Sequence, residues 1–98
     1  MLFRSPLLAG AAVATSINKL TKSKIYKCKW PNDILSEKKK IAGILSETFY
    51  KGIIIGIGIN VTTTIADLPI STASSIYLQS QVILDRNLLL SEIGRAHV

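Results

Sequence analysis

Residues 53–59 consist only of isoleucine and glycine, and this run limits the possible folds more than any other segment. Isoleucine is branched at Cβ and favours the extended backbone of a β-strand. A strand without polar residues is typical of a sheet interior, so we expect both of its faces to be covered. A bilayer span needs about 20 apolar residues, which excludes a membrane helix here.

Two glycines within this run, Gly56 and Gly58, have the spacing that begins a dinucleotide-binding loop. Val61 stands where the third glycine would be, and no helix is expected to begin there, so that interpretation fails. Alternate glycines in a strand instead indicate a close approach to the backbone on one face. Either a helix or an aromatic ring packs there, or a flat ligand binds there.

A helix is expected over residues 7–20, where Val13 and Ile17 fall on one helical face. Ser5 is a suitable N-cap and Pro6 suits the first helical position. A signal peptide is the alternative, because a basic residue precedes an apolar run that ends in Ala-Val-Ala. A proline directly before that run and a glycine inside it favour the packed helix.

The other elements follow from turn residues and alternating hydrophobicity. Three strands with short connections indicate an antiparallel meander with helices packed against it, so the predicted fold class is α+β. The sequence predicts strands over 24–30, 41–49 and 53–59, a short continuation at 34–35, a turn at 36–39, a loop at 62–64 and 69, helical turns within 72–78, and a helix over 86–93 capped by Asp85.

Composition narrows the functional classes. The 98 residues, 48% of them apolar, are enough for one small domain with a single core. One cysteine excludes an internal disulfide, and with one histidine there is no plausible zinc site. The net charge of +6 favours anionic partners. However, the lysine run at 38–40 is typical of a solvated turn, and few arginines are present, which disfavours a nucleic-acid-binding module.

Residues that could bind a ligand or take part in catalysis lie at the end of the first expected strand. Pro31 cannot donate to a sheet ladder, so the chain should leave the sheet there, with Asn32 and Asp33 in a turn. A capped turn is one interpretation of these residues. In the other, Asp33 lies near a magnesium ion bound to phosphate and Lys29 lies near the phosphate oxygens.

A second group lies at the start of the strand over 41–49. Lys40 directly precedes this strand, and a lysine at such a point can direct its ammonium group back into a site. Gly43 would let a ligand lie against the strand backbone.

Three segments, by their order and spacing, resemble the biotin–protein ligase family. The resemblance covers about residues 7–90 and implies a partial sheet flanked by helices, like the catalytic core of class II aminoacyl-tRNA synthetases. Ala73-Ser74-Ser75-Ile76 and Asp85-Arg86 are more weakly similar to the family's A-T-S-L and D-R elements. The three main segments are Lys29-Trp30-Pro31-Asn32-Asp33, Lys40-Ile41-Ala42-Gly43-Ile44-Leu45-Ser46-Glu47 and Gly56-Ile57-Gly58-Ile59-Asn60.

This resemblance implies a cytoplasmic, ATP- and magnesium-dependent ligase without a membrane partner. Biotin and ATP would give biotinyl-5′-AMP and pyrophosphate, and biotin would then pass to a lysine of a biotin carboxyl carrier protein. A homodimer of the parent enzyme is compatible with the family. By position, the resemblance assigns Lys40 and Asp33 to catalysis, and Asp33 also to an indirect magnesium contact. It assigns biotin binding to Lys40, Gly43, Leu45, Gly56 and Gly58. It assigns the binding of ATP or the adenylate to Lys29, Asn32, Asp33 and Asn60.

Several parts of the family's pattern have no counterpart in this sequence. They are the Gly-Arg-Gly-rich adenylate loop, the Ser/Thr segment that holds the biotin ureido ring, the C-terminal domain and the DNA-binding helix-turn-helix. We therefore expect residues 1–91 to be a catalytic-domain fragment that is inactive alone. Residues 92–98 resemble translated adapter DNA, and we expect a non-native tail there. A non-catalytic ligand-binding or interaction module is the alternative function.

Overall fold

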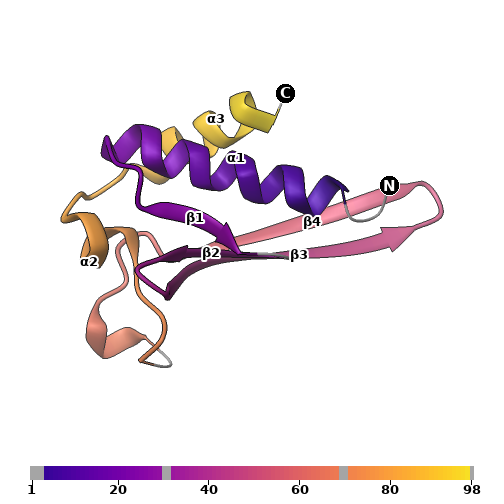
Figure 1. Ribbon diagram of the computed structural model, residues 1–98. Coiled ribbons are helices and arrows are strands. Elements are labelled where there is room, and N and C mark those ends of the chain that lie inside the picture. The colour runs from indigo at the N-terminus through magenta and orange to yellow at the C-terminus, as the bar shows by residue number, and fades with distance from the viewer. Residues whose placement is uncertain (1–3, 30–31, 69–70, 98) are drawn as a thin grey trace.

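A computed structural model describes residues 4–29, 32–68 and 71–97. Two helices lie side by side over one face of a four-stranded antiparallel sheet, which confirms the α+β fold class (Figure 1). No helix in the described part of the chain is both long and apolar enough to span a membrane. The elements are α1 (Arg4–Thr21), β1 (Tyr26–Lys29), β2 (Asp33–Ser36), β3 (Lys39–Phe49), β4 (Gly52–Ile59), the 3-10 helix η1 (Ile65–Asp67), α2 (Ile76–Ser80) and α3 (Arg86–His97).

The sheet is a meander in the order β1-β2-β3-β4, with one strand more than the sequence predicts. The segment at 34–35, expected to continue the first strand, belongs to the separate strand β2, which pairs antiparallel with β1. The predicted turn at 36–39 is too long, because Ser36 ends β2 and Lys39 begins β3. Only Glu37 and Lys38 are left to connect the two strands.

This two-residue turn requires an uncommon backbone conformation. Glu37 has φ 51° and Lys38 has φ 68°, so both lie in the left-handed region. Hairpin turns with two such residues favour Asn-Gly, because side chains with a Cβ are strained there. Neither residue has that preference, which is why the sequence gives no clear signal for the hairpin.

Replacing Lys38 with glycine is therefore expected to raise the free energy of unfolding by about 0.5–1 kcal/mol. The matched control is Lys39→Gly, which places glycine in a strand and should lower stability. Urea denaturation of both variants and the parent chain measures the difference. Equal destabilisation by the two substitutions would contradict the turn geometry.

The hydrophobic core lies between the sheet and the helices. Val13 and Ile17 of α1 are fully buried with Ile34 of β2 and Ile41 of β3. The Ala-Val-Ala segment that resembled a cleavage site lies in this core, as the packed-helix interpretation predicts. The expected N-cap is wrong, because α1 begins at Arg4 and Ser5 lies inside its first turn.

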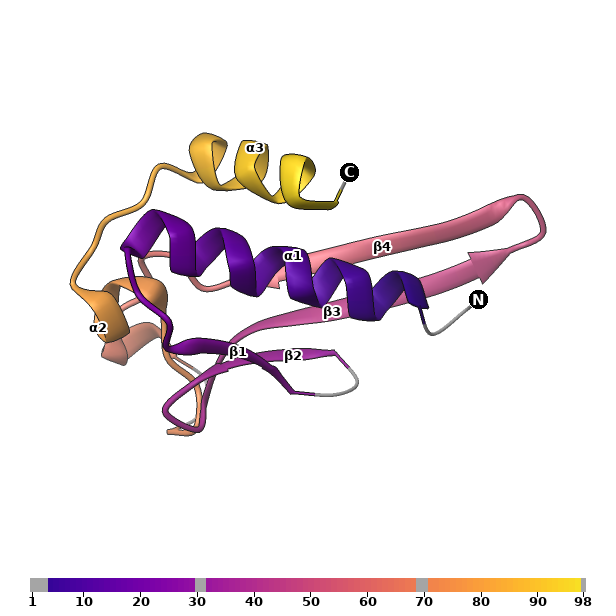
Figure 2. The same cartoon turned by 45° about the horizontal axis from the view of Figure 1, so that its top comes forward.

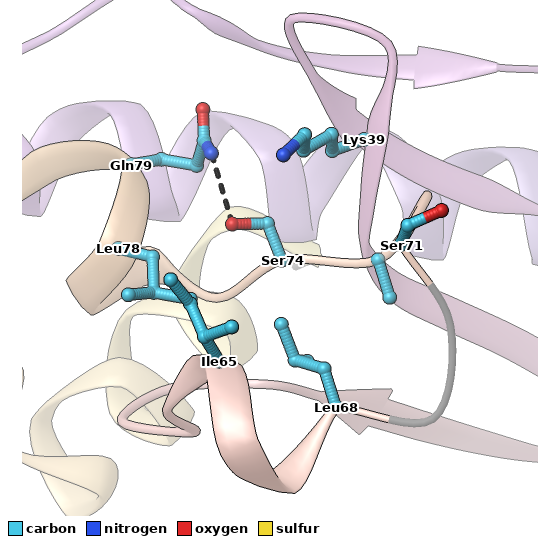
Figure 3. A pocket seen from close by; sticks show the side chains of 8 residues that line it. Lys39, Ile65, Leu68, Ser71, Ser74, Leu78 and Gln79 are labelled. Carbon is cyan, nitrogen blue, oxygen red and sulfur yellow. Dashed lines mark hydrogen bonds between the residues drawn. The ribbon is translucent and has the colours of Figure 1, made fainter.

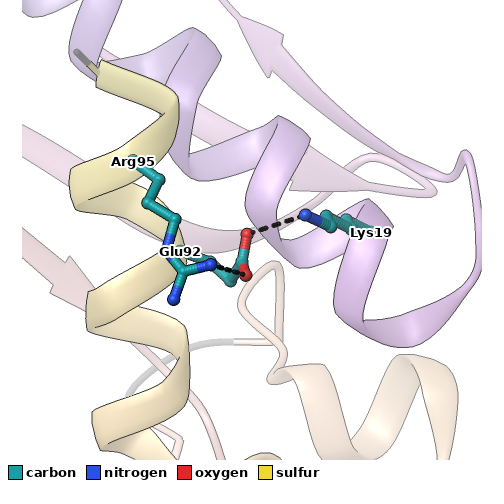
Figure 4. Close-up of polar contacts among 3 residues, drawn as sticks. All are labelled: Lys19, Glu92 and Arg95. Atoms are coloured by element: carbon teal, nitrogen blue, oxygen red, sulfur yellow. Dashed lines mark hydrogen bonds and ion pairs between the residues drawn. The ribbon is translucent and has the colours of Figure 1, made fainter.

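Helix α3 packs along α1 on the same side of the sheet (Figure 2). Asp85 caps it as predicted, with Oδ1 accepting from the Asn87 N–H at 2.8 Å. The helix continues past the predicted end at residue 93. Glu92 is buried and joins the two helices: its carboxylate lies 3.2 Å from Lys19 Nζ and 3.8 Å from Arg95 Nη1 (Figure 4).

The opposite face of the sheet is open along β3 and β4. Leu45, Ile54, Gly56 and Gly58 are exposed there. The prediction that both faces of the isoleucine-rich strand are covered is therefore wrong. Isoleucine determines the extended backbone of β4, but the helices supply a cover for one face only.

Candidate functional site

The open face brings together residues from three strands. Asp33 pairs with Gly43 and Gly43 pairs with Gly58, so these residues form a row across the sheet. Leu45 pairs with Gly56 two residues further along. Because side chains alternate between faces, all five positions lie on the same side. They line a groove of about 480 Å³ together with Asn32 and Lys40.

The glycines on β4 keep this groove unobstructed. A Cβ added at Gly58 would have no neighbour within 4 Å in the described part of the structure, and one at Gly56 would meet only the Leu45 carbonyl oxygen at 3.8 Å. The alternative that a helix or an aromatic ring packs on these glycines is therefore excluded for the described residues. The flat ligand stays a prediction.

Lys40 and Asp33 form an ion pair at one side of the groove. Lys40 Nζ lies 3.1 Å from Asp33 Oδ1, and both side chains remain partly exposed. The lysine side chain passes over Gly43, where an added Cβ would lie 3.2 Å from both Cε and Nζ. Gly43 thus makes room for the Lys40 side chain, a role that the sequence pattern did not suggest.

Asn60 directly follows β4 and lines an adjoining groove of about 490 Å³ that also contains Lys40. Its backbone N–H donates to the Ile41 carbonyl at 2.9 Å, and its side-chain Nδ2 donates to the Ser74 carbonyl at 3.1 Å. The structure therefore brings Asn60 close to the lysine, and part of its side-chain amide is already bound to the protein.

Only some residues of the segment from Lys29 to Asp33 line the groove. Asn32 lines it, and its carbonyl accepts from the Ile44 N–H at 2.8 Å. Lys29 pairs with Asp33 in the ladder but is exposed and does not line either groove. Residues 30 and 31 lie outside the described residues.

The single cysteine does not belong to the site. Cys28 lies on the helix-covered side, near Gly10 of α1. Cys28 is exposed overall, but partial burial of its thiol raises the pKa, so the reactive thiolate is scarce at neutral pH.

The expected indirect magnesium contact of Asp33 stays a prediction. Asp33 is paired with Lys40, and the described residues contain no group of three potential metal ligands among His, Cys, Asp and Glu. Magnesium is often held by one or two carboxylates together with substrate phosphates. These residues do not form a magnesium site of their own.

A further cavity of about 480 Å³, which sequence reasoning missed, lies behind the start of β3 (Figure 3). Lys39, expected to be a solvated turn residue, contributes to its wall. Polar side chains from α2 and the preceding segment meet there, and no local sequence pattern marks them. The lining residues are Lys39, Ile65, Leu68, Ser71, Ala73, Ser74, Leu78 and Gln79.

Comparisons with known proteins give a consistent result. Residues 5–63 match the model of the "Biotin/lipoate A/B protein ligase family". The chain is 36% identical over 95 residues to the bifunctional ligase/repressor BirA of Escherichia coli, covering 91% of this chain and 29% of that protein. It is 36% identical over 67 residues to the biotin–[acetyl-CoA-carboxylase] ligase of Mycobacterium tuberculosis, covering 68% of this chain and 25% of that protein.

Solved structures extend this likeness to the whole fold. The biotin protein ligase of Aquifex aeolicus in complex with biotin and ATP aligns with a TM-score of 0.85 at 29% identity, over 98% of this chain and 41% of that one. The ligase of Leishmania major in complex with biotinyl-5-AMP aligns with a TM-score of 0.78 at 25% identity, over 94% of this chain and 44% of that one. The chain spans less than a third of the curated relatives' length.

Proposed function

The chain belongs to the biotin/lipoate A/B protein ligase family, and on this basis we propose that its open sheet face forms one wall of a site that joins biotin to ATP. The observation that carries the proposal is the Lys40 ammonium group in the groove that also contains the two uncovered glycines of β4, Gly56 and Gly58. A relative with the same fold is known in complex with biotin and ATP, which supports this ligand pair.

The proposed first step is adenylation of biotin. A biotin carboxylate oxygen attacks the α-phosphorus of ATP, a new O–P bond forms, and the bond from the α-phosphorus to the bridging oxygen breaks, so that pyrophosphate leaves with the electron pair. Lys40 would neutralise negative charge on the carboxylate and the phosphate as this exchange proceeds. Asp33, at 3.1 Å, would hold the ammonium group at the edge of the groove until the substrates bind.

The remaining groove residues then have distinct roles. Gly56 and Gly58 would contact the flat ring system of biotin, because no side chain obstructs the backbone there. Gly43 and Leu45, their pairing partners on β3, would contact it beside the Lys40 side chain. Asn60 lies near Lys40 and would contact the adenylate.

The phosphates would extend from Lys40 towards Asn32, which lines the groove. Lys29 lies outside the groove and would contact phosphate oxygens only beyond its rim. Asp33 would approach a magnesium ion only indirectly, when ATP brings that ion with its phosphates.

The proposed second step is transfer of biotin to protein. The neutral amine of a lysine on a biotin carboxyl carrier protein attacks the acyl carbon of biotinyl-5′-AMP, an amide forms, the nitrogen gives up one proton to water, and AMP leaves with the electron pair of the broken C–O bond. The open face, on which Leu45 and Ile54 are exposed, would give a macromolecular acceptor access to the acyl carbon.

Gly58→Ala is expected to lower biotin affinity about 10-fold, because a methyl group would occupy space that the ring system needs. The experiment uses a ligase that contains this sequence within its catalytic domain, called the full-length enzyme below. Calorimetric titration with biotin measures affinity, and a thermal melt without biotin measures stability. The melting temperature should be unchanged, because nothing described lies within 4 Å of the new methyl group.

Ser91→Thr is the matched control, because it also adds one methyl group, at an exposed position of α3 on the other side of the sheet. This variant should bind biotin with unchanged affinity. Unchanged affinity in Gly58→Ala as well would show that the groove is not the biotin site.

A further inference from the structure

One buried serine connects the two strands that carry the proposed site. The Ser74 N–H donates to the Lys40 carbonyl at 2.9 Å, and the Ser74 carbonyl accepts from Asn60 Nδ2 at 3.1 Å. The Lys40 N–H donates to the Thr72 carbonyl at 2.8 Å, so the segment around Ser74 holds the lysine backbone on both sides. The location of this segment therefore affects the position of Lys40 and Asn60 together.

The Gln79 side chain fixes this segment from α2. Its Nε2 donates to Ser74 Oγ at 2.9 Å, and its Oε1 accepts from Ser36 Oγ at 3.1 Å. Ser74 is 2% exposed and Ser36 is 0% exposed, so water cannot readily replace either bond. Figure 3 shows the Gln79 amide directed at Ser74, with Lys39 across the cavity.

The two serines that the Gln79 side chain bonds, Ser36 and Ser74, lie on either side of Lys40. Ser36 is the last residue of β2, before the two-residue turn that leads into β3. Ser74 lies on the segment that holds the Lys40 backbone. Gln79 thus connects the strand that precedes the lysine with the segment beside it.

We propose that Gln79 is a positioning residue, which places the Lys40 ammonium group for adenylation by fixing Ser74 against the end of β2. This inference rests on the proposed function of the open face. Gln79 lies behind β3 and acts through the backbone without touching the substrate. Misplacing a reacting group by about 1 Å can reduce the rate up to 100-fold, so a small shift of Lys40 would be measurable.

The kinetic test compares two substitutions in the full-length enzyme. Gln79→Leu has a similar size but cannot bond either hydroxyl, and we expect kcat for biotinyl-adenylate formation to fall about 10-fold with the KM for biotin within about twofold. Gln79→Glu should restore most of kcat, because both serine hydroxyls can rotate to donate to a carboxylate. Gln81→Asn is the control on the exposed end of α2 and should match the wild type. A normal kcat in Gln79→Leu, or no rescue by Gln79→Glu, would overturn the proposal.

Amide hydrogen exchange in the same variants reports how firmly the Lys40 and Ser74 backbone is held, and it does not depend on enzyme activity. Gln79→Leu should accelerate exchange at the Lys40 and Ser74 amides about 10-fold while leaving Ile44, whose N–H donates to Asn32, unchanged. Equal acceleration at all three amides would mean general destabilisation and would overturn the positioning role. If the wild-type enzyme forms no adenylate, the proposed function fails, and the exchange pattern still decides whether Gln79 fixes Lys40.

Discussion

Replacing Lys40 with methionine is expected to lower the rate of biotinyl-adenylate formation about 100-fold in the full-length enzyme. Methionine keeps an aliphatic stem that can lie over Gly43 but removes the ammonium group that pairs with Asp33 at 3.1 Å. Negative charge then moves from the carboxylate to the phosphate oxygens without a cation beside it. Pyrophosphate release in the presence of biotin and ATP measures the rate.

Lys38→Met is the matched control, since Lys38 is exposed in the turn two residues earlier. It should leave the rate within about twofold of the wild type, because a solvated charge in the turn contributes little at the groove. Equal losses at the two positions would mean that general positive charge, and not the location of Lys40, supports the reaction.

The isolated 98-residue chain is expected to form no detectable biotinyl-adenylate. Its described residues provide one wall of the proposed site, and the face with Gly56 and Gly58 is exposed to water. Adenylation needs a site that encloses the substrates and excludes water, and closing segments commonly provide this. Incubation with biotin, ATP and magnesium followed by mass spectrometry tests the expectation. The full-length enzyme under the same conditions is the positive control, and comparable turnover by the isolated chain would contradict it.

The sequence predicts the β3–β4 hairpin and most of the groove. Strand alternation determines which residues share a face, so local spacing already places Gly43 with Leu45 and Gly56 with Gly58. The family pattern adds Lys40 and the Asp33 turn, which the structure brings within ion-pair distance. Their chemical roles stay predictions.

Other features depend on contacts that no local pattern encodes. β2 has only four residues and enters its turn through Glu37 and Lys38, which lack the usual hairpin preference. The bond between Ser36 and Gln79 joins residues 43 positions apart, so only the folded chain reveals it. Which face of β4 the helices cover likewise depends on tertiary packing and is not encoded in the residues of the strand.

In the middle of the hairpin, over residues 42–45 of β3 and 54–58 of β4, odd and even positions lie on opposite faces of the sheet. In β3 the even positions Ala42 and Ile44 are buried, whereas in β4 the even positions Gly56 and Gly58 are exposed. Random mutagenesis of the hairpin should therefore yield two alternating classes of variants. Substitutions at the buried positions would reduce the amount of folded protein, and substitutions at the exposed positions would change what the protein binds. Selection can therefore alter ligand preference here largely independently of folding.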